Sequence, residues 1–346
     1  MNSYLRKKNL MLILVIVAIT LSFVGCSNNG GNDNDSPDVP DVPDVADSTG
    51  ANTEKKSYNL ASASLGGTYY IVGSGVAEAI TKNVDNLTVN NINAQGSTGN
   101  PLMIKNGEVE LAMTNYYSGY NALNAKAIYK EKIDIAGICP LQYSIIQFFT
   151  FADRDDINTI ADLKGKKVAI GPAGGGGALI YKEILPYWGI TADDTIPSYV
   201  SYSDGSEALQ DKKIDMNVPH GAPPLEAISS VAFLNDIKII NMESDKLAEI
   251  TKDFPYYEAA TIPGGTYEGL DEDIQSVGIR DILVVSADMD EEEAYKITKA
   301  IYESIEKLKE IHPSLKEMSF DNYKHSLVPL HPGALRFYEE NNIPLS

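Results

Sequence analysis

The sequence feature that most constrains the fold is a glycine-rich turn between a short apolar run and a segment with helical periodicity. Residues 167–170 predict a buried strand, Pro172 stiffens its exit, and the four glycines at 174–177 open a helix. The first amides of such a helix have no acceptor within it, and the helix dipole makes this end positive, which suits a carboxylate or phosphate. Glycines also serve close packing alone. The turn has neither a P-loop lysine nor the spacing of a dinucleotide fingerprint.

The same strand–turn–helix arrangement occurs twice more. Residues 57–64 alternate as a strand does and lead through 66–70 (Gly-Gly-Thr-Tyr-Tyr) into a helical segment. Residues 88–94 lead through Gln-Gly-Ser-Thr-Gly-Asn to a short helix, with Asn100 predicted as its N-cap and Pro101 as its first residue. Three polar turns of one kind favour a shared ligand cleft.

The strand at 109–113 ends at Thr114-Asn115-Tyr116, where open α/β sheets place their ligands. About a hundred residues later, 203–218 repeats the pattern of polar turn, helix and strand, and ends at Pro219-His220-Gly221. This repetition predicts two similar α/β lobes. The residues that we expect to contact a ligand are Gly67, Thr68, Tyr69, Gln95, Ser97, Thr98, Asn115, Tyr116, Gly174, Gly175, Gly176, Gly177, Pro219, His220 and Gly221.

Two long apolar runs, 143–151 and 282–286, are predicted to be the strands that cross between the lobes. The predicted boundary is therefore discontinuous. Lobe 1 is expected to contain residues 57–148 and 280–346, and lobe 2 residues 149–279. After the second crossing, Asp288 is predicted to cap a long helix, with Glu291 at the capping-box position.

The N-terminal region is predicted to be an export signal and a tether. Residues 1–25 combine basic positions 6–8, an apolar run from 10 to 21, and a small residue before Cys26. The stretch ahead of Cys26 resembles a bacterial lipobox, which implies that Cys26 is lipidated; an uncleaved anchor is the alternative. Residues 26–56 are rich in Asn, Asp, Gly, Ser and Pro, have almost nothing to bury, and predict a disordered spacer.

Charge and motif content exclude several functions. With 28 basic and 48 acidic residues the chain is a poor partner for nucleic acid or for an anionic membrane surface. Cys139 is the only cysteine besides Cys26, and no histidine has a second ligand at metal-site spacing. No nucleophile elbow or zinc-ligand helix is present. We expect no metal, no cofactor and no enzymatic activity.

Four segments, taken in order, resemble the TAXI family, the TRAP-associated extracytoplasmic receptors. They are 66–70 (Gly-Gly-Thr-Tyr-Tyr), 95–100 (Gln-Gly-Ser-Thr-Gly-Asn), 162–172 (Asp-Leu-Lys-Gly-Lys-Lys-Val to Gly-Pro) and 329–334 (Pro-Leu-His-Pro-Gly-Ala). The resemblance implies a two-lobed, type II periplasmic-binding-protein-like fold that closes on a small organic anion. It also implies delivery to the membrane subunits of a tripartite ATP-independent periplasmic (TRAP) permease. Characterised relatives are associated with glutamate, related amino acids and dicarboxylates.

The chain departs from the family pattern at two places. The glycines at 174–177 offer no hydroxyl, and Asn115 and Tyr117 stand where the family usually has Gln and Asp. Arginines are few: after the signal there are Arg154, Arg280 and Arg336, of which the first two lie beside the predicted crossings. We therefore hypothesise recognition by amides, hydroxyls and tyrosines.

These observations predict a monomeric receptor anchored by lipid to the outer face of the cytoplasmic membrane. Two alternatives remain at the sequence level. The first is a ligand-sensing domain that reports to a membrane signalling partner, and the second is a small-molecule enzyme, because α/β lobes that close on a cleft also host catalysis.

Overall fold

The computed structural model describes residues 55–63 and 67–345, which belong to one compact unit of the chain. The predicted signal, Cys26 and nearly all of the predicted tether lie outside the described residues. Within the described part, no helix has the length and apolar character needed to cross a bilayer.

The first sheet has seven strands in the order β2-β1-β3-β12-β4-β9, with β11 paired to β12. Strands β1, β2 and β3 are parallel, and β12 runs antiparallel to both β3 and β4. The strand bounds are β1 Lys56–Ala61, β2 Leu87–Ile92, β3 Leu111–Asn115, β4 Ile135–Ile146, β9 His220–Gly221, β11 Glu258–Ile262 and β12 Ile274–Ser286.

The second sheet has five strands in the order β10-β5-β8-β6-β7. Its bounds are β5 Phe149–Phe151, β6 Lys167–Ala169, β7 Ile196–Ser198, β8 Met216–Asn217 and β10 Ile237–Ile239. Strands β6, β7 and β8 are parallel, and β5 is antiparallel to β8 and to β10. Both sheets therefore share one strand order. In each, the first parallel strand (β1 or β6) lies between the second (β2 or β7) and the third (β3 or β8). An antiparallel strand (β12 or β5) lies beside the third, and a further strand (β4 or β10) lies beside that one. The predicted pair of similar α/β lobes is confirmed.

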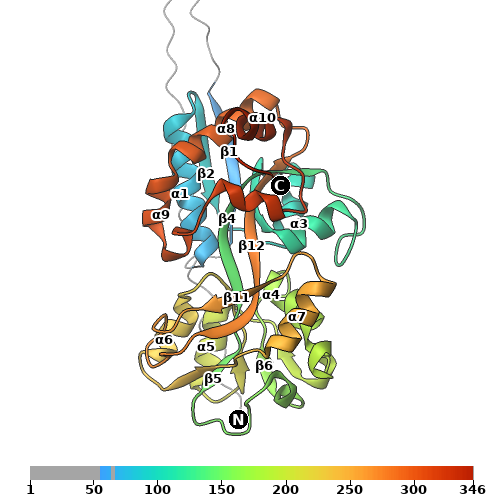
Figure 1. The fold of residues 1–346 in the computed structure, drawn as a ribbon, viewed down its shortest axis with the longest axis vertical. Helices are drawn as coiled ribbons and strands as arrows, with labels where there is room; N and C mark the ends of the chain where they lie inside the picture. Colours follow the sequence, from blue (N-terminus) through green and yellow to red (C-terminus); the bar gives the residue numbers. More distant parts are fainter. Residues whose placement is uncertain (1–54, 64–66, 346) are drawn as a thin grey trace, which may run out of the picture. The chain divides into compact units, whose positions relative to one another are not determined.

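The helices divide between the two sheets (Figure 1). We call the seven-stranded sheet with α1–α3 and α8–α10 lobe 1, and the five-stranded sheet with α4–α7 lobe 2. The helices are α1 Thr68–Asn83, α2 Asn100–Lys105, α3 Tyr116–Leu123, α4 Gly176–Ile184, α5 Tyr202–Gln210, α6 Glu226–Ala232, α7 Ser244–Asp253, α8 Glu291–Glu303, α9 Ile305–Ile311 and α10 Pro332–Glu340. Short 3-10 turns are η1 Ile160–Leu163, η2 Leu185–Trp188, η3 Ala192–Asp194, η4 Pro313–Leu315 and η5 Phe320–His325.

Two long strands run between the lobes: β4, which continues into β5, and β12, which runs beside β4 (Figure 1). The second crossing was placed too late by the sequence pattern. The apolar run 282–286 pairs with β3 inside the first sheet, whereas the start of β12 pairs with β11. Polar Gln275 and Ser276 interrupt the apolar pattern there, which is why the pattern missed this half of the strand. The exact lobe boundaries stay a prediction, and β9 and β11 both pair with strands of the first sheet.

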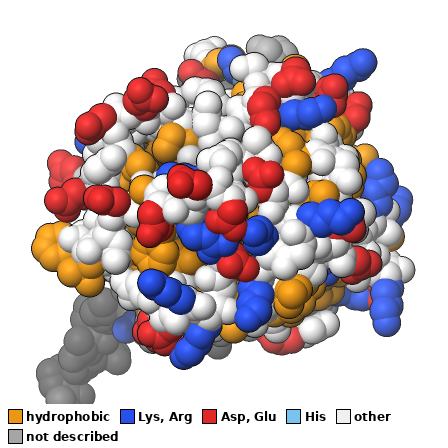
Figure 2. All heavy atoms as spheres, turned by 90° about the horizontal axis from the view of Figure 1, so that it is seen from below, with side chains coloured by type: hydrophobic (Ala, Val, Ile, Leu, Met, Phe, Trp, Pro, Cys, Tyr) orange, Lys and Arg blue, Asp and Glu red, His pale blue; other side chains and the backbone are white. Residues whose placement is uncertain are grey.

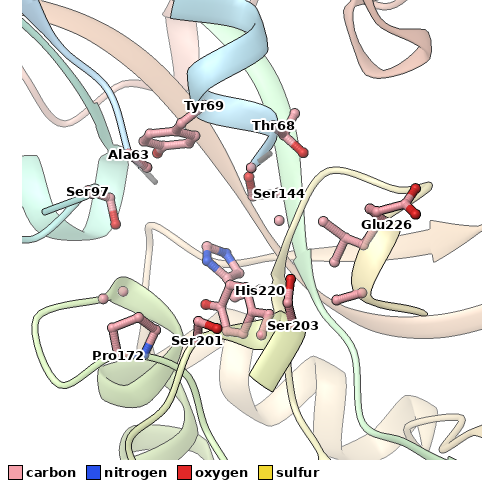
Figure 3. Close-up of a pocket in the computed structure, with 18 of the residues that line it drawn as sticks. Ala63, Thr68, Tyr69, Ser97, Ser144, Pro172, Ser201, Ser203, His220 and Glu226 are labelled. Atoms are coloured by element: carbon pink, nitrogen blue, oxygen red, sulfur yellow. The ribbon is translucent and has the colours of Figure 1, made fainter. Parts of the chain in front are cut away.

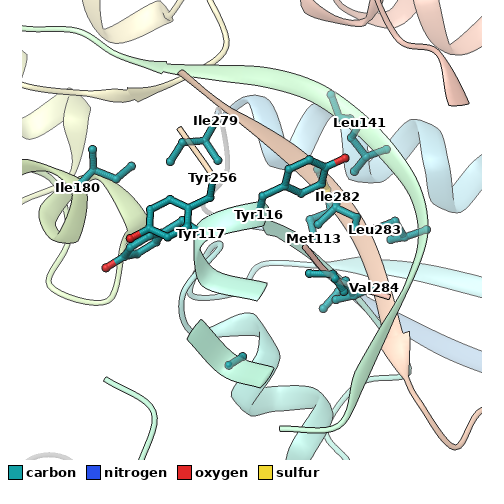
Figure 4. Close-up of a cluster of buried hydrophobic side chains, with 14 of the residues drawn as sticks. Met113, Tyr116, Tyr117, Leu141, Ile180, Tyr256, Ile279, Ile282, Leu283 and Val284 are labelled. Carbon is teal, nitrogen blue, oxygen red and sulfur yellow. The ribbon is translucent and has the colours of Figure 1, made fainter. Parts of the chain in front are cut away.

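Buried apolar side chains fill both lobes and continue between them. Figure 4 shows part of this core, in which Met113, Ile282 and Val284 lie near Tyr116. Tyr117 of α3 packs against Tyr256, which precedes β11, with ring centroids 5.0 Å apart. Aromatic contacts of this kind add about 0.5–1.5 kcal/mol beyond burial. This contact links the first turn of a lobe 1 helix to the chain that returns from lobe 2.

Two helix caps differ from the prediction. The cap of α8 is Asp290, whose side chain accepts from the amide of Glu293, and not Asp288. The cap of α2 is Gly99, which leaves Asn100 as the first helical residue. The Asn100 side chain donates instead to the carbonyls of Ala61, Ser62 and Met113, because it is fully buried there.

On the face drawn in Figure 2, acidic and basic side chains are interspersed rather than gathered into one basic patch.

Candidate functional site

A cavity of about 520 Å³ lies where turns of both lobes meet, a volume typical of small-molecule sites. Figure 3 shows Thr68, Tyr69, Ser97 and Ser144 on one side and Ser201, Ser203 and His220 on the other. The described residues that line it are Ala63, Gly67, Thr68, Tyr69, Asn93, Gln95, Gly96, Ser97, Ser144, Pro172, Gly175, Gly176, Ser201, Tyr202, Ser203, His220, Gly221, Leu225, Glu226 and Ala227.

Two equivalent helix N-termini reach the pocket. Helix α1 follows β1 and α4 follows β6, which are the first strands of their sheets. Each N-cap is a glycine, Gly67 or Gly175, with extended backbone and no side-chain cap. The first amides of both helices thus have no partner from a capping side chain, and both N-caps line the pocket. These two ends supply donors and positive dipole potential.

The glycines of α4 permit two close approaches, one between the lobes at Gly176 and one within lobe 2 at Gly177. A Cβ on Gly176 would lie 2.5 Å from the Ser97 hydroxyl oxygen, and a Cβ on Gly177 would lie 2.6 Å from the Tyr202 hydroxyl oxygen. Neither position tolerates a side chain without movement of its neighbour. The glycines of this turn therefore allow close packing and also leave backbone amides at the helix N-terminus.

Nine of the fifteen predicted contact residues line the pocket. They are Gly67, Thr68, Tyr69, Gln95, Ser97, Gly175, Gly176, His220 and Gly221. Contact between these residues and a ligand stays a prediction. The six that are not among the lining residues are Thr98, Asn115, Tyr116, Gly174, Gly177 and Pro219.

Internal hydrogen bonds account for four of the residues outside the lining. Thr98 is buried with its hydroxyl 3.3 Å from that of Ser118. Asn115 caps α3, its side-chain oxygen accepting from the Ser118 amide. Tyr116 donates to the carbonyl of Asn322, and the Pro219 carbonyl accepts from the amide of Gln147. The sequence could show that these residues follow a strand but not which way they turn.

Several lining residues were not predicted: Ala63, Asn93, Gly96, Ser144, Pro172, Ser201, Tyr202, Ser203, Leu225, Glu226 and Ala227. A signal existed for Ser201 to Ser203, because a polar turn begins α5 there as Gln95 to Ser97 precede α2 in the other lobe. No local signal marks Ser144, which lies within a long buried strand.

His220 is neutral at physiological pH, because burial lowers its pKa to about 4. Its Nε2 atom is buried and has no hydrogen-bond partner among the described residues. Tyr202, which also lines the pocket, has its pKa raised to about 12 by burial. Both side chains therefore offer neutral hydrogen-bonding groups.

Asp281 lies directly behind the pocket wall and was not predicted. The Tyr69 hydroxyl donates to its Oδ1 over 2.5 Å, and the Ser144 hydroxyl donates to its Oδ2. Asp281 is fully buried in β12, and burial raises its pKa to about 7. Its sequence signal is an acidic residue directly before the apolar run 282–285.

Among the described residues that line the pocket, none is lysine or arginine. Arg154 pairs with Asp156 and Asp215, and Arg336 pairs with two glutamates of α8. The Arg280 guanidinium lies 5.0 Å from the centre of the Tyr143 ring. Within the described part of the chain, no cluster of three potential metal ligands occurs.

Two similar α/β lobes joined by adjacent strands, with a polar pocket between them, define the type II periplasmic-binding-protein-like class. The chain belongs to the NMT1-like family, whose model matches residues 60–341.

Three solved structures with a similar chain path share little sequence identity with this chain. A putative L-cystine ABC transporter protein from Listeria monocytogenes is 13% identical, with 76% of this chain and 97% of that chain covered and a TM-score of 0.49. A histidine kinase sensor domain with similarity to periplasmic binding proteins is 15% identical, with 77% and 98% covered and a TM-score of 0.49. The alkanesulfonate-binding protein SsuA from Xanthomonas axonopodis pv. citri, bound to MOPS, is 11% identical, with 77% and 86% covered and a TM-score of 0.45.

Proposed function

We propose that this protein is an extracytoplasmic solute-binding receptor of the TAXI type, which captures a small carboxylate-bearing metabolite and delivers it to a TRAP permease. The observation that carries the proposal is the pocket between the lobes, into which α1 and α4 present glycine-capped N-termini. Two converging amide-rich ends favour a carboxylate. The four TAXI-like segments support the choice of transporter class.

Capture by lobe closure fits the contacts across the pocket. The Gly176 backbone of lobe 2 comes so near Ser97 of lobe 1 that no side chain fits between them. A ligand held between the two lobes would be enclosed from both sides. Because β4 and β12 are long strands that run side by side between the lobes, bending at these strands would open the pocket.

The proposed location and partners follow from the N-terminal sequence. A lipid on Cys26 and the polar segment at 26–56 would hold the folded unit near the outer face of the cytoplasmic membrane. Delivery to a permease then needs only diffusion along that surface.

The pocket does not support the enzyme alternative. His220 is the histidine of the described lining, and its Nε2 atom bonds none of the lining serines. An activated serine needs such a bond to a base. Incubation of the purified protein with a bound metabolite should therefore return the metabolite unchanged, and its turnover would contradict the receptor assignment.

Native mass spectrometry of the purified protein, followed by a melting screen of amino acids and dicarboxylates, tests the proposal. A ligand at a hundredfold excess over Kd should add about 2.7 kcal/mol to the free energy of unfolding. A Gly175→Pro variant loses the hydrogen bond from the Gly175 amide to the Pro172 carbonyl, which shapes the turn before α4, and should lose most of this gain. Uptake of the same compound should fail in cells that lack the protein. Binding without any uptake defect would favour the sensing alternative.

A further inference from the structure

We propose that the pocket selects a ligand with one carboxylate and one ammonium group, and discriminates against a second carboxylate. The carboxylate faces the N-terminus of α4, and the ammonium faces the wall formed by Ser144 with Asp281 behind it. This inference rests on the proposed function, because it names which class of carboxylate the same pocket accepts.

The pocket can neutralise one carboxylate but not two. Its described lining holds no lysine or arginine, and the undescribed positions 64–66 are serine, leucine and glycine in the sequence. His220 is neutral. The three arginines at 154, 280 and 336 are engaged with carboxylates or with a tyrosine ring outside the lining. A second carboxylate would therefore be buried without a cationic partner, which is strongly unfavourable.

The wall contributed by lobe 1 is built to accept hydrogen bonds. Ser144 is almost fully buried yet lines the pocket, and its single hydroxyl hydrogen is directed to Asp281. Its oxygen lone pairs are what remains for a ligand. The Tyr69 hydroxyl lies within donating distance of Asp281 and of the Thr114 carbonyl, and the charge of the neighbouring Arg280 favours the ionised form of Asp281. When ionised, this carboxylate attracts a cation at the Ser144 side of the pocket.

The α4 side has the opposite polarity. Gly175 and Gly176 line the pocket at an uncapped helix N-terminus, so backbone amides and the positive end of the dipole face the ligand. His220, with its unpartnered Nε2, adds one neutral group nearby. The pocket is thus donor-rich at one end and acceptor-rich at the other, which matches a zwitterion.

Three compounds of one length separate the possibilities: glutarate, glutamate and glutamine. Glutarate has two carboxylates and no ammonium, glutamate adds the ammonium, and glutamine replaces the second carboxylate by a neutral amide. Calorimetric titration should give Kd values that fall in that order, with glutamine bound at least tenfold more tightly than glutarate. Glutarate binding as tightly as glutamine would overturn this inference and leave the proposed function standing. Binding of none of the three to cooperatively melting protein would count against both.

Variants then locate the acceptor wall. In Asp281→Asn, the Kd for glutamine should rise at least tenfold, whereas the Kd for glutarate should stay within threefold or fall. Ser144→Ala tests the same wall by a smaller change, and it carries the test if Asp281→Asn fails to melt cooperatively. The control is Asp288→Asn, which makes the same charge change at an exposed position just after β12. An equal loss for glutamine and glutarate in both wall variants would contradict the proposed orientation.

Discussion

The N-termini of α1 and α4 occupy equivalent positions in two lobes of one plan, yet their surroundings differ. Both follow the first strand of their sheet and begin with an uncapped glycine. The second residue of α1 is Tyr69, which bonds the buried Asp281. The second residue of α4 is Gly177, which packs against Tyr202 and His220. The shared architecture therefore supplies two amide-rich ends, and the side chains behind them give the pocket its polarity.

The largest expected effect is the pH dependence of stability caused by Asp281, the buried carboxyl group behind α1. Because burial raises the pKa of Asp281 to about 7, the folded state binds its proton more tightly than the unfolded chain does. This stabilisation is full below about pH 4 and is lost as pH rises to about 7, a difference on the order of 4 kcal/mol. The titratable or charged groups beside Asp281 are Tyr69 and Arg280, and burial raises the pKa of Tyr69 well above this window.

Urea unfolding of wild type and Asp281→Asn from pH 4 to pH 8 measures this effect. The difference between the two curves should show wild type losing stability relative to the variant as pH rises. Asp288→Asn, at an exposed site, should run parallel to wild type. A wild-type curve parallel to that of Asp281→Asn would contradict a raised pKa at this carboxyl group.

The next effect concerns the steric role of α4. In Gly176→Val, the new Cβ meets the Ser97 hydroxyl, and overpacking of this kind costs about 1–3 kcal/mol. If closure is needed for binding, affinity should fall roughly tenfold to hundredfold. The matched change in the other lobe is Thr68→Val, the first residue of α1, which alters a hydroxyl without adding bulk. Calorimetry should show a clearly smaller loss of ligand affinity in Thr68→Val than in Gly176→Val. Equal losses would contradict the proposed difference between the two helix N-termini.

A smaller effect on stability is expected from loss of the hydrogen bond that Tyr69 of α1 donates to Asp281. Tyr69→Phe leaves Asp281 with one donor fewer in a buried site, so we expect a loss of about 1–3 kcal/mol in the free energy of unfolding at pH 7. Tyr187→Phe is the matched control, since Tyr187 donates to Asp253 over 2.7 Å at an exposed site. Its stability should stay within about 0.5 kcal/mol of wild type. Similar losses in both variants would show that the Asp281 contact has no special weight.

The smallest effect concerns Arg154. It pairs with Asp156 and Asp215 away from the pocket lining, so Arg154→Ala should leave ligand affinity within twofold of wild type. Its stability should fall by about 0.2–1 kcal/mol, as is typical of partly exposed ion pairs. A tenfold loss of affinity would place this arginine in recognition and overturn the reading of the pocket as free of cationic side chains.

The sequence predicted the fold better than the site. Repeated glycine turns after apolar runs were enough to predict two similar lobes, because backbone geometry and periodicity are local properties. The position of the second crossing was wrong, since polar residues hide the first half of β12. The return of the chain to lobe 1 was itself predicted, because two long apolar runs bracket the second lobe in the sequence, and the exact boundaries stay a prediction.

At the site, the prediction worked where the turn itself faces the pocket and failed where orientation depends on distant contacts. Gly67, Gly175 and His220 line the cavity as expected from their turns. Tyr116 follows a strand in the same way, but its hydroxyl donates to the carbonyl of Asn322, more than two hundred residues later, and it lies outside the pocket lining. Asp281 and Ser144 meet only because two distant strands pair. Such pairings cannot be inferred from periodicity.

A crystal structure of the protein with its tightest-binding compound would show directly where and how the ligand binds. We expect electron density for the ligand between the lobes, with a carboxylate within hydrogen-bond distance of the backbone amides that begin α4 and an amine near Ser144. Ligand density at any other surface, or a carboxylate that points toward Ser144 instead, would contradict this expectation.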